Sequence, residues 1–171
     1  MAKSEYVFKQ QLNNVFSALT VQNRLVCDIA LQTGLRISDV LSLTPQQFEK
    51  NRFTVKEQKT GKTKQIYIRE NLRKLSIAQT GEFYLFPNRF DEKRHKTRQA
   101  IYADIRRACK AFRLKQQGSP HSLRKIYAVD LYAKYGDMKK VQKALNHSNQ
   151  AVTIIYALAD MLTERKKKVT K

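Results

Sequence analysis

The chain contains Pro120-His121-Ser122-Leu123-Arg124, then Leu145-Asn146-His147-Ser148, and then Tyr156. This stretch is the most informative part of the sequence. The stretch holds two histidines, an arginine and a tyrosine, side chains that can bind phosphate or move its protons. Nearer the N-terminus, a second arginine lies in Thr33-Gly34-Leu35-Arg36-Ile37-Ser38-Asp39, and lysines lie in Lys59-Thr60-Gly61-Lys62. Side chains of these types are suited to chemistry on a phosphate group.

The charge of the chain indicates a polyanionic partner. Lys and Arg number 34 against 14 Asp and Glu, which gives a formal net charge of +20 over 171 residues. This excess predicts nucleic-acid binding through phosphate contacts that weaken with salt. Hydrophobic residues make up 42% of the chain, which favours one domain with a core over a disordered basic tail. A ribosomal-type protein would share this charge, so charge alone does not decide the function.

The spacing of cysteines and histidines argues against a metal site, and the hydropathy argues against a membrane-spanning segment. Cys27 and Cys109 form no C-x-x-C pair, and Cys109 lies on an apolar helical stripe that predicts a buried free thiol. A single disulfide is compatible with the sequence but not implied by it. The three histidines show no paired ligand spacing, so we expect no structural zinc. No apolar run approaches the ~20 residues of a membrane span, and we expect a cytoplasmic, DNA-associated protein.

Periodicity predicts a mainly α fold of the α+β class with one small antiparallel β-sheet. Phe53 and Val55 alternate with polar neighbours, as do Ile66 and Ile68, which indicates a β-hairpin around a turn that contains Gly61. Residues 83–86 are either a short strand or a buried loop. Apolar residues at helical spacing predict helices over 5–19, 21–32, 38–43, 70–77, 97–112, 121–134, from Met138 to Leu145, and over 150–162.

Two arginines are candidate phosphate ligands. Taken alone, Arg36 is most simply a surface arginine at a helix start, and His121 a histidine at a helix N-terminus without a task. A guanidinium is always charged and binds two oxygens at once, which suits the equatorial oxygens of a phosphoryl transition state. Asp39 lies one helical turn after Arg36 and is placed to orient it. His121 lies one turn before Arg124, so both project from one helix face.

A lysine and a tyrosine are the remaining candidates for phosphate chemistry. Most lysines in turns are merely solvated, and this is the plain interpretation of Lys59, Lys62 and Lys64. Tyr156 is one of eight tyrosines, and core packing or surface stacking is the default for any of them. A phenol has an ordinary pKa of about 10, so Tyr156 would need nearby cations to attack at neutral pH.

In order and spacing, these motifs resemble the catalytic domain of the tyrosine recombinases, the phage-integrase family. The resemblance covers about Val21 to Tyr156 and implies the fold of DNA breaking-rejoining enzymes. It rests on the arginine motif at 33–39, Lys-Thr-Gly at 59–61, Pro-His-x-Leu-Arg at 120–124, and a tyrosine nine residues after His147. The family usually has Leu-Gly-His where this chain has Leu-Asn-His, and Asn146 tolerates a left-handed backbone better than most residues.

The resemblance implies a transesterification in which Tyr156 attacks the scissile phosphate and forms a 3′-phosphotyrosyl link. Lys59 would protonate the leaving 5′ oxygen, because the family places its catalytic lysine in this hairpin, and Lys62 is the reserve. The covalent link conserves the energy of the phosphodiester bond. We therefore expect neither ATP nor a metal nor any other cofactor.

The resemblance also assigns the remaining catalytic residues. Arg36 and Arg124 would hold the non-bridging phosphate oxygens, with Asp39 behind Arg36. His121 and His147 would assist in proton transfer and hydrogen bonding.

The family organisation implies a single catalytic domain over residues 1–171, without the N-terminal core-binding domain that family members usually carry. We expect the C-terminal basic tail, residues 157–171, to be the protomer-docking segment, since family members exchange strands as four protomers on two duplexes. The expected partners are double-stranded DNA and three further copies of the chain on DNA, with a monomer in isolation and no membrane contact. Further basic residues are expected to contact DNA: Arg98, Arg106, Arg107, Lys110, Lys139 and Lys140.

Three other functions would use part of the same pattern. A catalytically decayed or accessory DNA-binding protein would keep the charge but would not need six ordered polar residues. A type IB topoisomerase-like enzyme shares the chemistry but would relax any supercoiled plasmid without a partner site. A generic basic RNA-binding protein leaves the ordered motifs unexplained. The sequence therefore favours a site-specific DNA recombinase or integrase.

Overall fold

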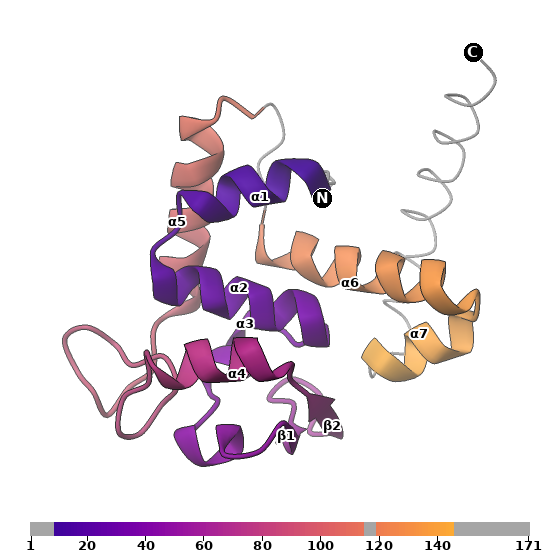
Figure 1. The fold of residues 1–171 in the computed structure, drawn as a ribbon, viewed down its shortest axis with the longest axis horizontal. Helices are drawn as coiled ribbons and strands as arrows, with labels where there is room; N and C mark the ends of the chain where they lie inside the picture. Colours follow the sequence, from indigo (N-terminus) through magenta and orange to yellow (C-terminus); the bar gives the residue numbers. More distant parts are fainter. Residues whose placement is uncertain (1–8, 115–118, 146–171) are drawn as a thin grey trace.

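The structure is a computed structural model that describes residues 9–114 and 119–145. His147, Tyr156, the expected helix over 150–162 and the tail at 157–171 lie outside the described residues. The described part confirms the predicted mainly α fold with one small antiparallel sheet (Figure 1). The elements follow in the order α1 (Lys9–Ser17), α2 (Val21–Thr33), α3 (Ile37–Leu41), the 3-10 turn η1 (Pro45–Phe48), β1 (Arg52–Lys56), β2 (Thr63–Tyr67), α4 (Glu70–Ile77), α5 (Arg98–Ala111), α6 (Pro120–Tyr135) and α7 (Met138–Leu145).

Helix α2 is the central element, and both of its ends are fixed by local sequence. The Thr20 side chain accepts a hydrogen bond from the Asn23 amide and caps the helix start. Gly34 ends the helix in a left-handed conformation, with φ of 67°, and its N–H donates to the Ala30 carbonyl. A Cβ atom on Gly34 would lie 2.3 Å from Cδ1 of Tyr127, so α6 passes close to this point. Only glycine fits this conformation and this contact together.

The two strands form the predicted hairpin around a glycine-containing turn. Phe53 pairs with Ile66 and Val55 with Lys64 across the antiparallel sheet, and Gly61 has φ of 66°. Residues 83–86 form a loop rather than a strand, and only its second half is buried, since Phe83 is exposed. Leu85 and Phe86 are fully buried, and the Leu85 amide donates to the Leu43 carbonyl at 2.8 Å.

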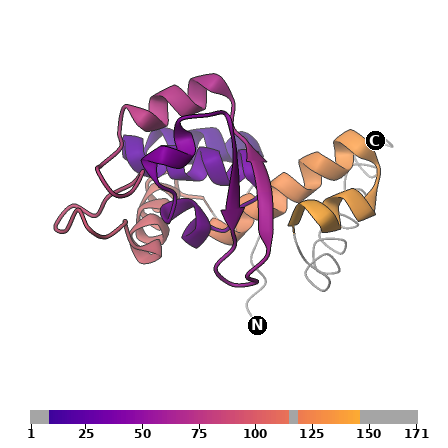
Figure 2. The same ribbon diagram turned by 90° about the horizontal axis from the view of Figure 1, so that it is seen from below.

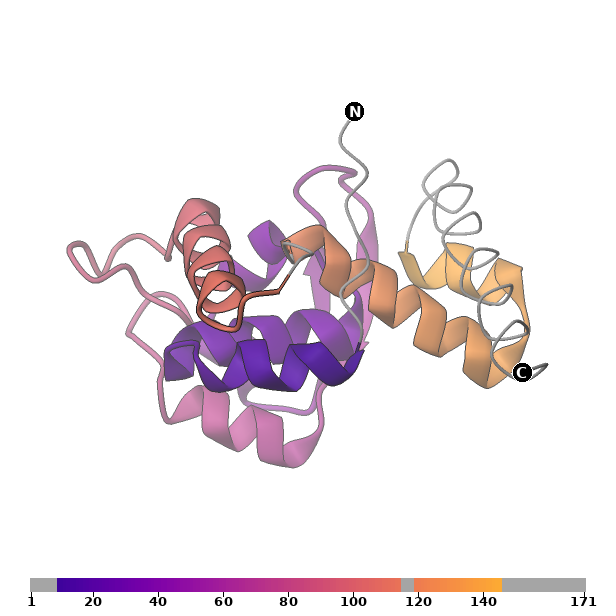
Figure 3. The ribbon, with the colours of Figure 1, turned by 90° about the horizontal axis from the view of Figure 1, so that it is seen from above.

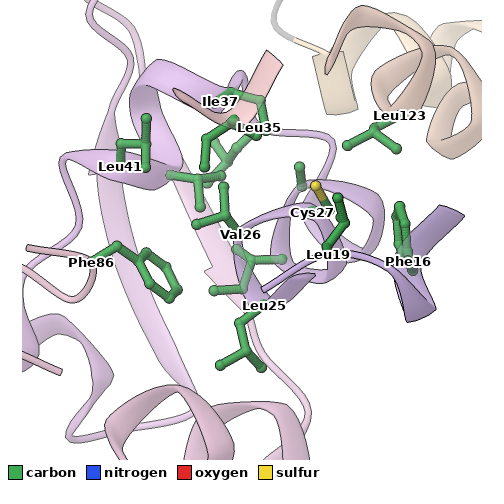
Figure 4. Packing of buried hydrophobic residues seen from close by; sticks show 14 of the residues in the cluster. Phe16, Leu19, Leu25, Val26, Cys27, Leu35, Ile37, Leu41, Phe86 and Leu123 are labelled. Carbon is green, nitrogen blue, oxygen red and sulfur yellow. The ribbon is translucent and has the colours of Figure 1, made fainter. Parts of the chain in front are cut away.

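The main core lies between α1, α2, α3, α5 and the hairpin, with α6 closing one side. Val26, Cys27 and Ile29 of α2 are fully buried at its centre, and Figure 4 shows this packing from close by. Truncating one such aliphatic side chain to alanine typically costs about 2–5 kcal/mol. Both cysteines are free and buried, as the stripe containing Cys109 predicts for that thiol.

Helix α6 belongs to two clusters. Its first half packs on the main core through Leu123 and Ile126, whereas Ala128 joins Val141 and Leu145 in a smaller cluster with α7. Figures 2 and 3 show α6 leading away from the body of the molecule and α7 folding back along it. The last residue of α7 therefore returns toward the start of α6, where the predicted site lies. Among the described residues, no helix is both long and apolar enough to cross a membrane.

Candidate active site

A pocket of about 360 Å³ opens between α3, α5 and the start of α6. Three of the predicted catalytic residues, Arg36, His121 and Arg124, meet in its wall although they come from distant parts of the sequence. The full lining is Arg36, Ile37, Ser38, Arg98, Gln99, Tyr102, Pro120, His121 and Arg124.

Arg36 lies immediately before α3, and its side chain is only 13% exposed. Its Nη1 donates to Oε2 of Glu57 at 2.7 Å and lies 3.9 Å from Oδ2 of Asp39. Both carboxylates are fully buried. Asp39 therefore takes the position behind Arg36 that the spacing predicts, but Glu57 makes the closer contact.

The pKa values of the two carboxyl groups shift in opposite directions. Burial raises the pKa of Asp39, against the opposing effect of the hydrogen bond from the Gln58 amide, and the charge of Glu57 adds to the rise. Burial also acts to raise the pKa of Glu57, but hydrogen bonds from Arg36 and Thr60 outweigh it and the net pKa is lowered. Glu57 is thus the firmly ionised partner of Arg36.

Arg124 projects from the first half of α6 and is 7% exposed. Its Nη1 donates to the Gly34 carbonyl and its Nη2 to the Leu145 carbonyl. Burial, followed by the charge of Arg36, lowers the pKa of Arg124 to about 10, so the guanidinium remains charged at neutral pH. Leu145 is two residues before His147, so Arg124 fixes the end of α7 beside the segment that carries the second predicted histidine.

His121 lies in the first turn of α6, which begins at Pro120 after a reciprocal cap between Ser119 and Ser122. This start directs His121 and Arg124 to the same pocket. Burial and then the charge of Arg98 lower the pKa of His121 below its usual 6.5. The imidazole is therefore neutral at pH 7 and can accept or donate a hydrogen bond.

The three hairpin lysines differ in environment. Lys59 and Lys62 are exposed on the turn, whereas Lys64 points inward from β2 and its Nζ donates to the Thr33 carbonyl at 2.6 Å. Burial lowers the pKa of Lys64 to about 8, and the charge of Arg124 contributes. The predicted proton donor is Lys59, with Lys62 as the reserve, whereas the buried position of Lys64 was not predicted.

Glu57 and Lys64 are the two polar residues near the site that the sequence analysis missed. The strand pattern contains the signal for both. Val55 is buried and Glu57 is two residues on, while Lys64 is two residues before buried Ile66. Alternation therefore places both charges on the inward face, where a charge requires a partner.

The other predicted DNA contacts are exposed but do not share one environment. Arg98 lines the pocket, and Arg106 lies over the ring of Tyr102, 5.8 Å from its centroid. Arg107 pairs with Asp104 at 2.6 Å and also donates to the Ala18 carbonyl, so it ties α5 to the end of α1. The three remaining residues, Lys110, Lys139 and Lys140, are exposed on α5 and α7.

The chemistry available at the pocket is that of an anion site. Three guanidinium groups and a neutral imidazole line it, and two buried carboxylates balance part of the positive charge from behind Arg36. Within residues 9–114 and 119–145, no group of three His, Cys, Asp or Glu side chains is arranged to hold a metal ion.

Comparisons with known proteins identify relatives of this chain. The phage integrase family model matches residues 5–162. The chain is 32% identical to the probable integrase/recombinase YoeC of Bacillus subtilis over 141 residues, which cover 79% of this chain and 76% of that protein. It is 27% identical to the integrase of Escherichia phage P2 over 154 residues, which cover 89% of this chain and 42% of that protein. The chain spans about half the length of several such relatives.

Solved structures show the same fold. The crystal structure of XerA recombinase has a TM-score of 0.73 at 18% identity and covers 96% of this chain and 65% of that one. A lambda integrase dimer bound to a COC′ core site has a TM-score of 0.72 at 20% identity, covering 90% of this chain and 60% of that one.

Proposed function

The chain belongs to the phage integrase family, and from this premise we propose that it cuts and rejoins DNA strands by transesterification at the pocket of Arg36, His121 and Arg124. The observation that carries the proposal is the convergence of two largely buried guanidinium groups and one histidine on a single pocket. Family membership favours this function over a decayed DNA-binding protein and over a type IB topoisomerase-like enzyme.

In the proposed reaction, Arg36 and Arg124 bind the non-bridging oxygens of the scissile phosphate. Two of the five Arg124 N–H groups donate to the Gly34 and Leu145 carbonyls, and the buried Nε has no acceptor among the described residues. The phenol of Tyr156 gives its proton to neutral His121 as its oxygen attacks phosphorus, a 3′-phosphotyrosyl bond forms, and the bond to the 5′ oxygen breaks. Lys59 gives its proton to that oxygen, and Lys62 is the reserve donor.

The two histidines complete the proposed site. His121 is neutral at pH 7 and lies in the pocket wall, where it can exchange a proton or hydrogen-bond the phosphate. His147 follows the segment that Arg124 holds at Leu145. We propose that it joins His121 at the same phosphate.

The proposed partner is double-stranded DNA, because the chain carries a net charge of +20 and exposes Arg98 at the pocket. We further propose a monomer in isolation and a homotetramer on DNA, docked through residues 157–171, in the cytoplasm.

Covalent trapping tests the function. The chain is incubated with a library of nicked duplexes, and SDS-stable protein–DNA adducts are isolated and their DNA is sequenced. We expect an adduct with wild type and with Tyr67→Phe, an exposed hairpin tyrosine that serves as the matched control, and none with Tyr156→Phe. An adduct that survives in Tyr156→Phe would refute the assigned nucleophile. DNA binding without any adduct would favour the decayed-protein hypothesis.

A further inference from the structure

Glu57 is a fully buried carboxylate that the reaction outlined above does not use. It lies directly after β1, at the start of the turn that carries Lys59. Its Oε2 accepts two hydrogen bonds, from Arg36 Nη1 at 2.7 Å and from Thr60 Oγ1 at 2.9 Å. One oxygen therefore links a phosphate-binding arginine to the residue after the proposed catalytic lysine.

Main-chain hydrogen bonds of residue 57 close the same turn that its carboxylate contacts. The Gly61 amide donates to the Glu57 carbonyl at 2.9 Å, and the Glu57 amide donates to the Lys62 carbonyl at 2.9 Å. Gly61 adopts φ of 66°, which permits the tight turn that these bonds close.

Asp39 provides a second anchor from the opposite direction. Its Oδ1 accepts the Gln58 amide at 2.9 Å, while its Oδ2 lies 3.9 Å from Arg36 Nη1. Lys59 thus lies between two anchored neighbours, Gln58 and Thr60. Its exposed side chain takes its direction from a backbone held on both sides.

The charge of Glu57 matters as much as its shape. A buried carboxylate without a cation is strongly disfavoured, so Glu57 and Arg36 must stay together. Thr60 binds the same oxygen, so the turn cannot shift without disturbing Arg36. Arg36 and the turn that carries Lys59 therefore move together.

We propose that Glu57 is a positioning residue that holds Arg36 and the Lys59 turn in fixed relation, so that phosphate ligand and proton donor reach the same phosphate together. This inference rests on the proposed function. A misplacement of about 1 Å at a reacting group can slow a reaction on the order of 100-fold, which sets the scale of the expected effect.

The first experiment measures single-turnover adduct formation on a DNA site recovered from the trapped library. We expect Glu57→Ala to slow adduct formation on the order of 100-fold. Glu57→Gln keeps the side-chain volume and an oxygen acceptor but loses the charge, so it should slow the reaction by about tenfold, the difference between an ionic and a neutral hydrogen bond. Should Glu57→Ala fail to fold, Glu57→Gln carries the test. Glu70→Gln is the matched control, because it makes the same chemical change at an exposed glutamate of α4 that pairs with Arg73 at 2.8 Å. Neither residue lines the pocket, so this variant should react like wild type.

A second substrate distinguishes the contribution of Lys59 to the reaction rate from that of Arg36. Sulfur replaces the 5′ bridging oxygen, so that the P–S bond breaks and a thiolate leaves without needing a proton, because a thiol pKa is only about 8.5. If Glu57 positions Lys59, most of the slowing in Glu57→Ala or Glu57→Gln should disappear on this substrate. Equal slowing on both substrates, or wild-type rates on both, would overturn the proposal.

Amide hydrogen exchange tests the anchoring without any reaction. The Gln58 and Gly61 amides should exchange at least about tenfold faster in Glu57→Ala or Glu57→Gln, but not in Glu70→Gln. These amides donate to the Asp39 carboxylate and to the Glu57 carbonyl, and they lose those hydrogen bonds only when the turn opens. Unchanged exchange would refute the role of Glu57 in holding the turn. If wild type cleaves neither substrate, the proposed function fails, while the exchange result still decides whether Glu57 fixes the turn.

Discussion

Replacing Lys64 with methionine should stabilise this protein at neutral pH. Lys64 points inward from β2 opposite Val55, and its Nζ lies 5.5 Å from the centroid of the Tyr127 ring. Burial, and then the charge of Arg124, lower its pKa from 10.5 to about 8. The folded protein therefore holds this ammonium at a cost that the unfolded chain does not bear.

The size of the effect follows from the pKa. A fall from 10.5 to about 8 corresponds to about 3 kcal/mol of lost folding stability while the lysine is protonated in both states. Methionine fills a similar volume and removes this cost. It also loses the hydrogen bond to the Thr33 carbonyl, worth about 1 kcal/mol. Lys64→Met should therefore raise the free energy of unfolding by about 2 kcal/mol at pH 7.

The advantage of Lys64→Met must depend on pH in one direction. Between pH 8 and 10.5 the unfolded chain keeps the Lys64 proton and the folded chain loses it, so wild type gains stability over this window. The difference between variant and wild type should be constant below pH 8 and shrink above it.

Urea unfolding of both proteins across neutral and alkaline pH measures this difference. Lys62→Met, on the exposed turn, is the control and should show no such trend. A less stable Lys64→Met protein at pH 7, or a stability difference that does not change with pH, would refute the reasoning.

Three further substitutions test other contacts. Arg36→Met should destabilise the fold by about 3–5 kcal/mol in urea unfolding, because it leaves Glu57 buried without its cation, and adding Glu57→Gln should restore part of the loss. Gly34→Ala should cost about 2–4 kcal/mol in the same assay, since the left-handed backbone is strained and the new Cβ meets an aromatic ring. Cleavage should fall as pH drops through a midpoint below 6.5, where His121 becomes protonated, and His121→Gln should remove that inflection from the pH–rate profile.

Each of these expectations has a result that would contradict it. Wild-type stability in Arg36→Met would show that the ion pair does not balance the buried carboxylate. Gly136→Ala is the control for Gly34→Ala, because Gly136 has φ of 63° with nothing within 4 Å of an added Cβ, and equal costs at both positions would refute the clash. An inflection that persists in His121→Gln would assign that titration to another group.

Periodicity predicted most of the fold because the helices carry clear apolar stripes. Residues 70–77 were predicted as a helix and form α4, and the pattern over 97–112 gave α5 to within one residue at each end. The proximity of Arg36 to His121 and Arg124 could be predicted only from the family resemblance, because no local sequence pattern shows that such distant residues meet. Alternation in the two strands assigns Glu57 and Lys64 to the inward face, but their partners come from distant parts of the chain. Arg36 binds Glu57 and the Thr33 carbonyl accepts from Lys64, and no local pattern shows these contacts.

The structural role of Arg107 could not be predicted from the sequence, because one of its partners is distant in the chain. Its position on the polar face of α5 indicated a DNA contact, but Asp104, three residues before it, binds the guanidinium, and the Ala18 carbonyl accepts a second bond. A basic residue one helical turn from an acid is often paired to it, so spacing to acids refines a prediction based on charge.

The end of α2 explains how several cations remain close together before any phosphate is bound. The last carbonyls of a helix carry partial negative charge. Thr33 offers its carbonyl to Lys64, and Gly34 offers its carbonyl to Arg124. The left-handed turn at Gly34 directs these two successive carbonyls toward cations from β2 and α6, while buried Glu57 pairs with Arg36. Both arginines are thus held from behind while they line the pocket, so a phosphate can bind without the protein first having to collect its positive charges.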